Sequence, residues 1–162
     1  MNLWLALGLM LAQVQASASP SSVPSKPPLV RRGVDTAPRI AAGDITIRNS
    51  GSTNFAGYTV VVHPDGAADV TINGVTTPQN LAATETKALF DKVTAAAPLD
   101  AMPAGGCMKS ASFGTSTTVS YGSTTSTDIS CGGNPAMHEL AQTVSAVVSA
   151  LHIASVRKAL RP

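Results

Sequence analysis

The distribution of apolar and polar residues divides the chain into three parts. A continuous apolar run covers residues 3–11, and a stretch rich in proline and serine follows it. Alternating or helix-spaced apolar positions begin near Asp44. Because these periodicities are typical of folded secondary structure, we expect a single domain over residues 44–153.

Three strands are predicted at the start of this domain. Ile45 and Ile47 alternate with polar residues, which is typical of a half-buried strand. A β-branched run over 58–63 is followed by a Pro-Asp-Gly sequence at 64–66, which favours a chain reversal, and by a further strand over 69–72. The pattern therefore predicts one strand followed by a hairpin.

Two amphipathic helices are also predicted. Apolar residues recur at helical spacing over 83–97, and Pro98 ends that pattern. Asn134 and Pro135 have the form of an N-cap followed by proline at the first helical position. A second helix is therefore expected to run from about 135 to 152.

The Ser/Thr-rich segment over 115–130 is interpreted as a second hairpin, because Val119, Tyr121 and Ile129 interrupt its hydroxyl residues and Gly122 favours a turn. Its register is open to two interpretations.

The length of the loop decides between the two registers. A two-residue loop pairs Tyr121 with Thr124 and places Val119 and Ile129 on opposite faces. A three-residue loop pairs Tyr121 with Thr125 and places both apolar residues on one face. We favour the three-residue loop.

The order β-β-β-α-β-β-α predicts an α+β fold, with an antiparallel sheet of about five strands and two helices packed on one face. The other face then carries polar side chains in place of large apolar ones. A regular array of hydroxyls can bind carbohydrate or ordered water, although solvated sheet faces are also usually polar. The candidate binding residues on this face are Thr118, Ser120, Ser126 and Asp128.

The N-terminal part has the features of an export signal. Its apolar run of nine residues is far shorter than the ~20 that span a bilayer, so no permanent membrane anchor is expected. Small residues at Ala16 and Ala18 form an A-x-A cleavage site. We therefore expect a signal peptide over 1–18, cleaved after Ala18 or two residues earlier. A buried N-terminal helix is the alternative, because no Lys or Arg precedes the run.

Composition adds two terminal segments to this picture. Residues 19–40 are rich in proline and serine and predict a disordered leader, and residues 154–162 form a basic tail. Between Asp44 and Ile153 the chain has four basic and eight acidic residues, a net charge of −4, so the overall charge of +2 comes from the ends. An acidic domain with few aromatic residues does not favour nucleic acid as a partner. The basic ends can contact anionic envelope surfaces weakly.

Cys107 and Cys131 are the two cysteines of the chain. A pair of cysteines in an exported protein favours a disulfide. A catalytic or metal-bound thiol would need a CxxC spacing or a histidine nearby in the sequence, and neither is present. We therefore predict a bond between Cys107 and Cys131 that ties the loop after the first helix to the end of the last strand.

Other candidate chemistry is weak. His138, Asp128 and a serine could form a Ser/His/Asp set, but no GxSxG or comparable motif identifies a nucleophile. Asp65 and Asp69 flank a glycine, but alanines interrupt the alternation of oxygen ligands that a calcium loop needs. We expect no catalytic residue, metal or cofactor.

Several segments together resemble a family of small exported bacterial proteins known only as a domain of unknown function. They are GYTVVVHPDG, TETKALFDKVTAAAPLD and SFGTSTTVSYGSTTSTDISC, together with Cys107 and the closing helix. The resemblance implies the same compartment, architecture and cysteine pairing, and it carries no activity. We expect a periplasmic or secreted binding module or envelope accessory protein without catalysis. The alternative is a small secreted hydrolase using a Ser/His/Asp set.

Overall fold

The computed structural model describes residues 43–153. The predicted signal peptide (1–18), leader (19–40) and basic tail (154–162) lie outside the described residues. In chain order, the elements are β1 (Ile45–Asn49), β2 (Tyr58–Val62), β3 (Ala67–Ile72), β4 (Val75–Asn80), α1 (Ala83–Ala96), the 3-10 helix η1 (Leu99–Ala101), β5 (Thr117–Tyr121), β6 (Thr124–Thr125), the 3-10 helix η2 (Ile129–Cys131) and α2 (Pro135–Ala150).

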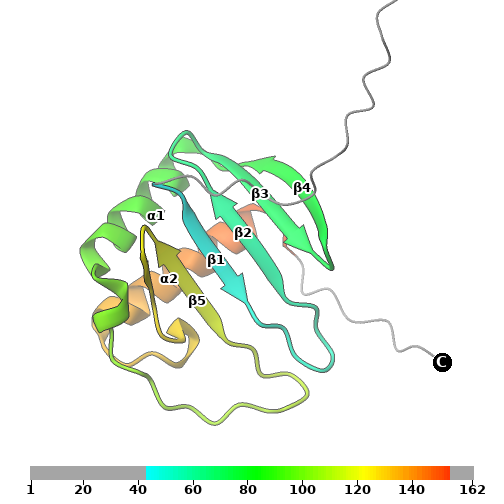
Figure 1. The fold of residues 1–162 in the computed structure, drawn as a ribbon, viewed down its shortest axis with the longest axis vertical. Helices are drawn as coiled ribbons and strands as arrows, with labels where there is room; N and C mark the ends of the chain where they lie inside the picture. The colour runs from blue at the N-terminus through cyan, green and yellow to red at the C-terminus, as the bar shows by residue number, and fades with distance from the viewer. Residues whose placement is uncertain (1–42, 154–162) are drawn as a thin grey trace, which may run out of the picture. The chain divides into compact units, whose positions relative to one another are not determined.

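Residues 43–153 form a six-stranded sheet in the order β4-β3-β2-β1-β5-β6. Each neighbouring pair of strands is antiparallel. Both α-helices pack on the same face of the sheet (Figure 1). The predicted α+β class and the placement of the two helices are confirmed.

The hydrophobic core lies between the sheet and these helices. Strand alternation directs Ile45 and Ile47 of β1 toward the helices, where both are fully buried. Leu89 of α1 and Leu140 of α2 are fully buried from the other side. Each such apolar side chain contributes about 1.5–3 kcal/mol by leaving water, so this layer supplies most of the stability of the domain.

The start of α2 agrees with the sequence. Asn134 has an extended backbone, and its side-chain Oδ1 accepts a hydrogen bond of 2.8 Å from the Met137 amide. Pro135 occupies the first turn of the helix. Backbone N–H groups there have no partner within the helix, so the N–H that proline lacks is not needed. The helix ends at Ala150, two residues before the predicted end.

The sheet has six strands rather than about five because β4 was not predicted. Asn73 and Gly74 form a two-residue loop, both with positive φ (52° and 78°), and Ile72 pairs with Val75 across it. This is the typical chemistry of a tight hairpin. The strand contains Pro78, which lacks a backbone donor but is tolerated because β4 lies at the edge of the sheet.

The predicted register of the second hairpin is wrong. Tyr121 pairs with Thr124 and Ser120 pairs with Thr125, so the loop has two residues, not three. The prediction assumed that the returning strand continues to Ile129, whereas β6 ends at Thr125.

The side chain of Ser126 explains why the returning strand is short. Its Oγ accepts a hydrogen bond of 2.9 Å from the Val119 amide, where a strand would place a backbone carbonyl. The chain then leaves the sheet, and Asp128 caps η2 by accepting from the Ser130 amide. Ile129 begins η2 and is buried in the same core as Val119. The two apolar residues therefore lie on the same side of the sheet, although Ile129 is not part of a strand.

None of the helices within 43–153 is long and apolar enough to cross a membrane.

Candidate functional site

The predicted disulfide is confirmed. Cys107 and Cys131 are bonded, with their Cα atoms 5.3 Å apart and a sequence separation of 24. The bond ties the long loop after η1 to the end of η2. Gly105 lies against this junction, and a Cβ there would meet the Cys131 carbonyl oxygen at 2.8 Å, so the close approach requires glycine.

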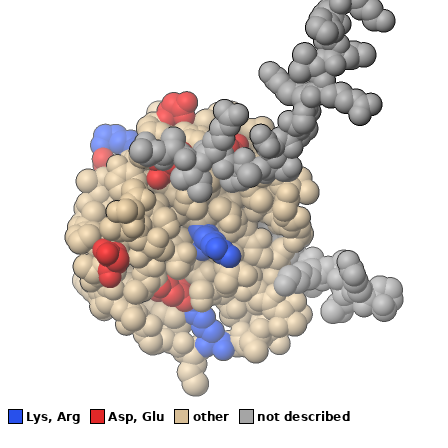
Figure 2. Space-filling view, in the orientation of Figure 1, with Lys and Arg blue, Asp and Glu red and all other residues tan. Residues whose placement is uncertain are grey.

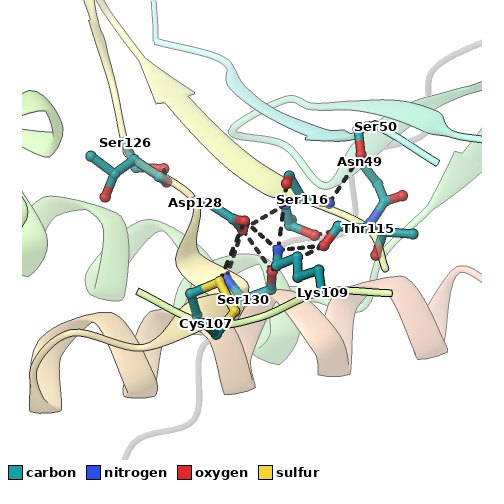
Figure 3. Close-up of polar contacts among 12 residues, drawn as sticks. Asn49, Ser50, Cys107, Lys109, Thr115, Ser116, Ser126, Asp128 and Ser130 are labelled. Atoms are coloured by element: carbon teal, nitrogen blue, oxygen red, sulfur yellow. Dashed lines mark hydrogen bonds and ion pairs between the residues drawn. A yellow bond between two sulfur atoms is a disulfide. The ribbon is translucent and has the colours of Figure 1, made fainter. Parts of the chain in front are cut away.

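A group of polar residues adjoins the disulfide, and we call Lys109, Asp128 and Ser130 the Lys109–Asp128 cluster (Figure 3). The Lys109 ammonium forms an ion pair with Asp128 and donates to the Ser130 Oγ at 2.7 Å. It also donates to the backbone carbonyl of Thr115. The cluster therefore joins the loop that contains Lys109 to both ends of the second hairpin.

The carboxylate of Asp128 accepts several hydrogen bonds. Its donors are the amides of Thr117 (3.0 Å) and Ser130 (3.1 Å), the Ser130 hydroxyl (2.6 Å) and Lys109. Burial alone would raise the pKa of Asp128, but the hydrogen bonds from Lys109, Ser130 and the two amides outweigh burial and hold the pKa well below its ordinary range. The carboxylate therefore stays charged in the folded protein at all ordinary pH values.

The contacts of the Lys109–Asp128 cluster differ from those of a lysine that activates a serine. A lysine that activates a serine must be neutral in order to take its proton. Lys109 donates to a carboxylate, a hydroxyl and a carbonyl, which together account for its three N–H donors. Lys109 therefore donates to the Ser130 Oγ, whereas an activating lysine would accept the proton of that hydroxyl.

The structure does not bring the alternative Ser/His/Asp set together. His138 is exposed on α2 and its Nε2 lies 2.9 Å from the Gln142 amide nitrogen, one turn later on the same helix. Asp128 pairs with Lys109. Among residues 43–153, no described contact joins His138 to Asp128.

The four candidate binding residues lie in two different places. Thr118 and Ser120 on β5 point away from the helices, as predicted. Ser126 is buried, and its hydroxyl also donates to the Thr127 carbonyl at 2.8 Å. Asp128 belongs to the Lys109–Asp128 cluster. The polar face of the sheet therefore keeps two of the four residues.

The side of the sheet that faces away from both helices is called the open face here, and Figure 2 shows that its described surface carries few charged side chains. Hydroxyls face one another across its strands, with Thr71 and Thr76 at 2.8 Å and Ser120 and Thr125 at 2.9 Å. The residues of the open face, given by strand alternation, are Thr46, Arg48, Thr59, Val61, Ala67, Asp69, Thr71, Thr76, Pro78, Asn80, Thr118, Ser120 and Thr125.

Exposure differs along the open face. Val61 and the neighbouring Asp44 are buried near the end where β2 turns into β3. Toward the opposite end of β1, Arg48 is exposed and Thr59 is half-buried. The exposed side chains of the open face therefore include Arg48 on β1 and, on the edge strands, Pro78 and Thr125.

Arg48 lies in a row of side chains that otherwise carry hydroxyls. In the register of the sheet, Arg48 is opposite Thr59 on β2 and Thr118 on β5, and the row continues through Thr71 and Thr76. A polar hollow of about 240 Å³ adjoins it, and its lining includes Arg48, Thr59 and Thr71. Our sequence analysis missed Arg48, although its alternation with Ile45 and Ile47 placed it on the polar face.

His63 lies beside the buried end of the open face. Its Nδ1 is 3.0 Å from an Asp44 oxygen, and its Nε2 is 3.8 Å from an Asp69 oxygen. The hydrogen bond with Asp44 raises the pKa of His63, against the opposing effect of burial, and Asp69 adds to the rise. Within the described part of the chain, no three His, Cys, Asp or Glu side chains are grouped so that they could hold a metal ion.

A second, smaller cavity of about 200 Å³ lies between the sheet and α2. Its apolar lining comes from Ile129, Val144 and Val148, and Tyr58 contributes a hydroxyl. Burial raises the pKa of Tyr58, which keeps the phenol neutral. Small-molecule sites are usually larger, about 300–1,000 Å³, so this cavity, like the hollow beside Arg48, is too small for a whole drug-sized ligand.

Comparison with protein-family models, curated proteins and solved structures finds no match to this chain. The function must therefore be argued from the residues themselves.

Proposed function

We propose that this protein is an exported, non-enzymatic binding module whose open face binds an oligosaccharide of the cell envelope. The observation that carries the proposal is the unequal use of the two faces of the sheet. Both α-helices cover one face, while the other presents hydroxyls from β1, β2, β3, β4, β5 and β6 and is covered by no helix within residues 43–153.

The chemistry of this face suits a ligand rich in hydroxyl groups. Neighbouring strands lie about 4.8 Å apart, so Thr59, Thr71 and Thr118 present their hydroxyls at regular intervals across the sheet. A hydroxyl both donates and accepts hydrogen bonds. A sugar chain offers the same dual groups along its length, so it can both donate to and accept from these hydroxyls.

Two further observations support the proposal. Side chains on paired strands are held in place before a ligand arrives, which lowers the entropy cost of binding. The Cys107–Cys131 bond is typical of proteins outside the cytosol, and it agrees with the signal peptide expected over residues 1–18.

Substitution of two hydroxyls tests the proposal. In the double variant Thr59→Val and Thr118→Val, shape is kept and two hydrogen-bonding groups are lost, so binding to envelope oligosaccharides should weaken by about tenfold or more. Isothermal calorimetry with defined oligosaccharides measures the change. Thr94→Val, an exposed position on α1, is the matched control and should bind like the unmodified protein.

Two outcomes would contradict the binding module. Equal binding by the double variant and by Thr94→Val would show that the open face is not the site. Specific labelling by a reactive-serine probe, abolished by His138→Ala, would instead support the secreted hydrolase.

A further inference from the structure

The charge of Arg48 is uncompensated among the described residues. Within 43–153, the other three cationic side chains each form an ion pair: Lys87 with Asp91, Lys92 with Glu139 and Lys109 with Asp128. Arg48 has no carboxylate within 4.0 Å in the same part of the chain. An arginine left without a partner in a polar hollow is available to a ligand.

The surroundings of Arg48 favour an oxygen anion. A guanidinium presents five N–H donors in a planar fork that matches a carboxylate or sulfate. Thr59 and Thr118 lie opposite Arg48 on the two neighbouring strands, and their hydroxyls can donate to the same anion. Asn73 and Thr71 complete the polar lining on the side of β3.

The size of the hollow and the charge of the domain limit the ligand to one anionic group at this point. A volume of about 240 Å³ is below that of a site for a whole drug-sized ligand. The net charge of −4 over residues 44–153 opposes the approach of a dense polyanion. The hollow therefore suits one charged group of a larger ligand that extends along the hydroxyl row.

We propose that Arg48 is the anion subsite of the open face and that the ligand is an acidic oligosaccharide, with one carboxylate or sulfate ester seated on the guanidinium. This inference rests on the proposed function and deepens it, because it names the chemical class of the sugar. Arg48 would select the acidic unit, and the hydroxyl row would hold the neighbouring sugar units.

The test compares matched acidic and neutral sugars on the full mature chain. The probes are an oligogalacturonate that keeps one free carboxylate and has its others methyl-esterified, its fully methyl-esterified form, and a galactose oligosaccharide with one sulfate ester. We expect at least one acidic probe to bind, and the full methyl ester to bind about 10- to 100-fold more weakly than the form with one free carboxylate if the carboxylate is the anion, because a charge-assisted bond is lost. Arg48→Gln should bind the acidic probe more weakly by the same factor, and Arg48→Lys should show a smaller loss of affinity.

Lys87→Gln is the control, because it removes an equal charge from an exposed position on α1. It should leave binding unchanged. Circular dichroism of Arg48→Gln checks that the fold persists.

The outcomes separate this inference from the proposed function. If charged and neutral probes bind equally and Arg48→Gln has no effect, the anion subsite is wrong while the sugar-binding face stands. If Lys87→Gln weakens binding as much as Arg48→Gln, the effect comes from general electrostatic attraction, and the anion subsite at Arg48 is wrong. If no acidic probe binds, the inference is overturned, and the outcome of the Thr59 and Thr118 double variant then decides the proposed function independently.

Discussion

The two faces of the sheet are built from the same strands but serve different purposes. Ile47 and Arg48 are adjacent on β1, yet Ile47 is fully buried against the helices and Arg48 is exposed on the open face. The strand period of two makes this separation possible, since each strand contributes alternate side chains to each face. The buried and exposed side chains lie on opposite faces, so we expect stability and the proposed ligand binding to be separable by mutation.

The largest expected effect is a loss of stability on mutation of the core, which is compared here with a mutation of the open face. Leu89→Ala removes a fully buried side chain and should lower the free energy of unfolding by about 2–5 kcal/mol. Thr59→Val should change it by less than about 0.5 kcal/mol. Urea denaturation with linear extrapolation measures both values. If the two variants lost similar stability, the open face would have to be regarded as part of the core.

Loss of the disulfide is expected to have the next largest effect. The double variant Cys107→Ser and Cys131→Ser releases a loop closed across 24 residues and should lower the free energy of unfolding by about 3 kcal/mol. Binding by the open face should persist, because β5 remains paired with β1. Reductant should lower the melting temperature of the unmodified protein and leave that of the double variant unchanged. If the double variant also lost ligand binding, the disulfide would be needed for binding as well as for stability.

The ion pair of Asp128 should make a smaller contribution to the free energy of unfolding, and this contribution should depend on pH. Because the folded pKa is depressed, this carboxylate stabilises the fold above its unfolded pKa of about 4, and the stabilisation falls as the pH drops below that value. Asp128→Asn should cost about 2 kcal/mol at pH 7 and should flatten the decline in stability on acidification.

Denaturation from pH 7 to pH 2 measures this pH dependence. Asp100→Asn, at an exposed carboxylate, is the control and should behave like the unmodified protein. A pH profile of Asp128→Asn that parallels the unmodified one would show that Asp128 does not contribute in this way.

The sequence predicted those parts of the fold that local periodicity specifies. Both helices, β1 and the hairpin of β2 and β3 follow directly from alternating or helix-spaced apolar residues. β4 was missed because its apolar pattern is weak and it contains Pro78, although Asn73 and Gly74 carried a hairpin signal. An edge strand can have fewer apolar residues than a central strand, so it is harder to predict from the alternation of apolar residues.

Contacts made by side chains with the backbone could not be read from the pattern. The register of the second hairpin depends on the Ser126 hydroxyl, which replaces a strand bond to Val119. Lys109 and Asp128 are 19 residues apart in irregular segments, so no periodicity joins them. Of the four candidate binding residues, Thr118 and Ser120 lie on the open face, and Ser126 and Asp128 hold the second hairpin together.

The most direct test of the open face as the binding surface is nuclear magnetic resonance mapping with the oligosaccharide that binds most tightly. We predict that backbone amide shifts change most at Arg48, Thr59 and Thr118, and that those of exposed positions on α1 and α2 change little. Shifts concentrated on the helices, or around the Lys109–Asp128 cluster, would contradict the account.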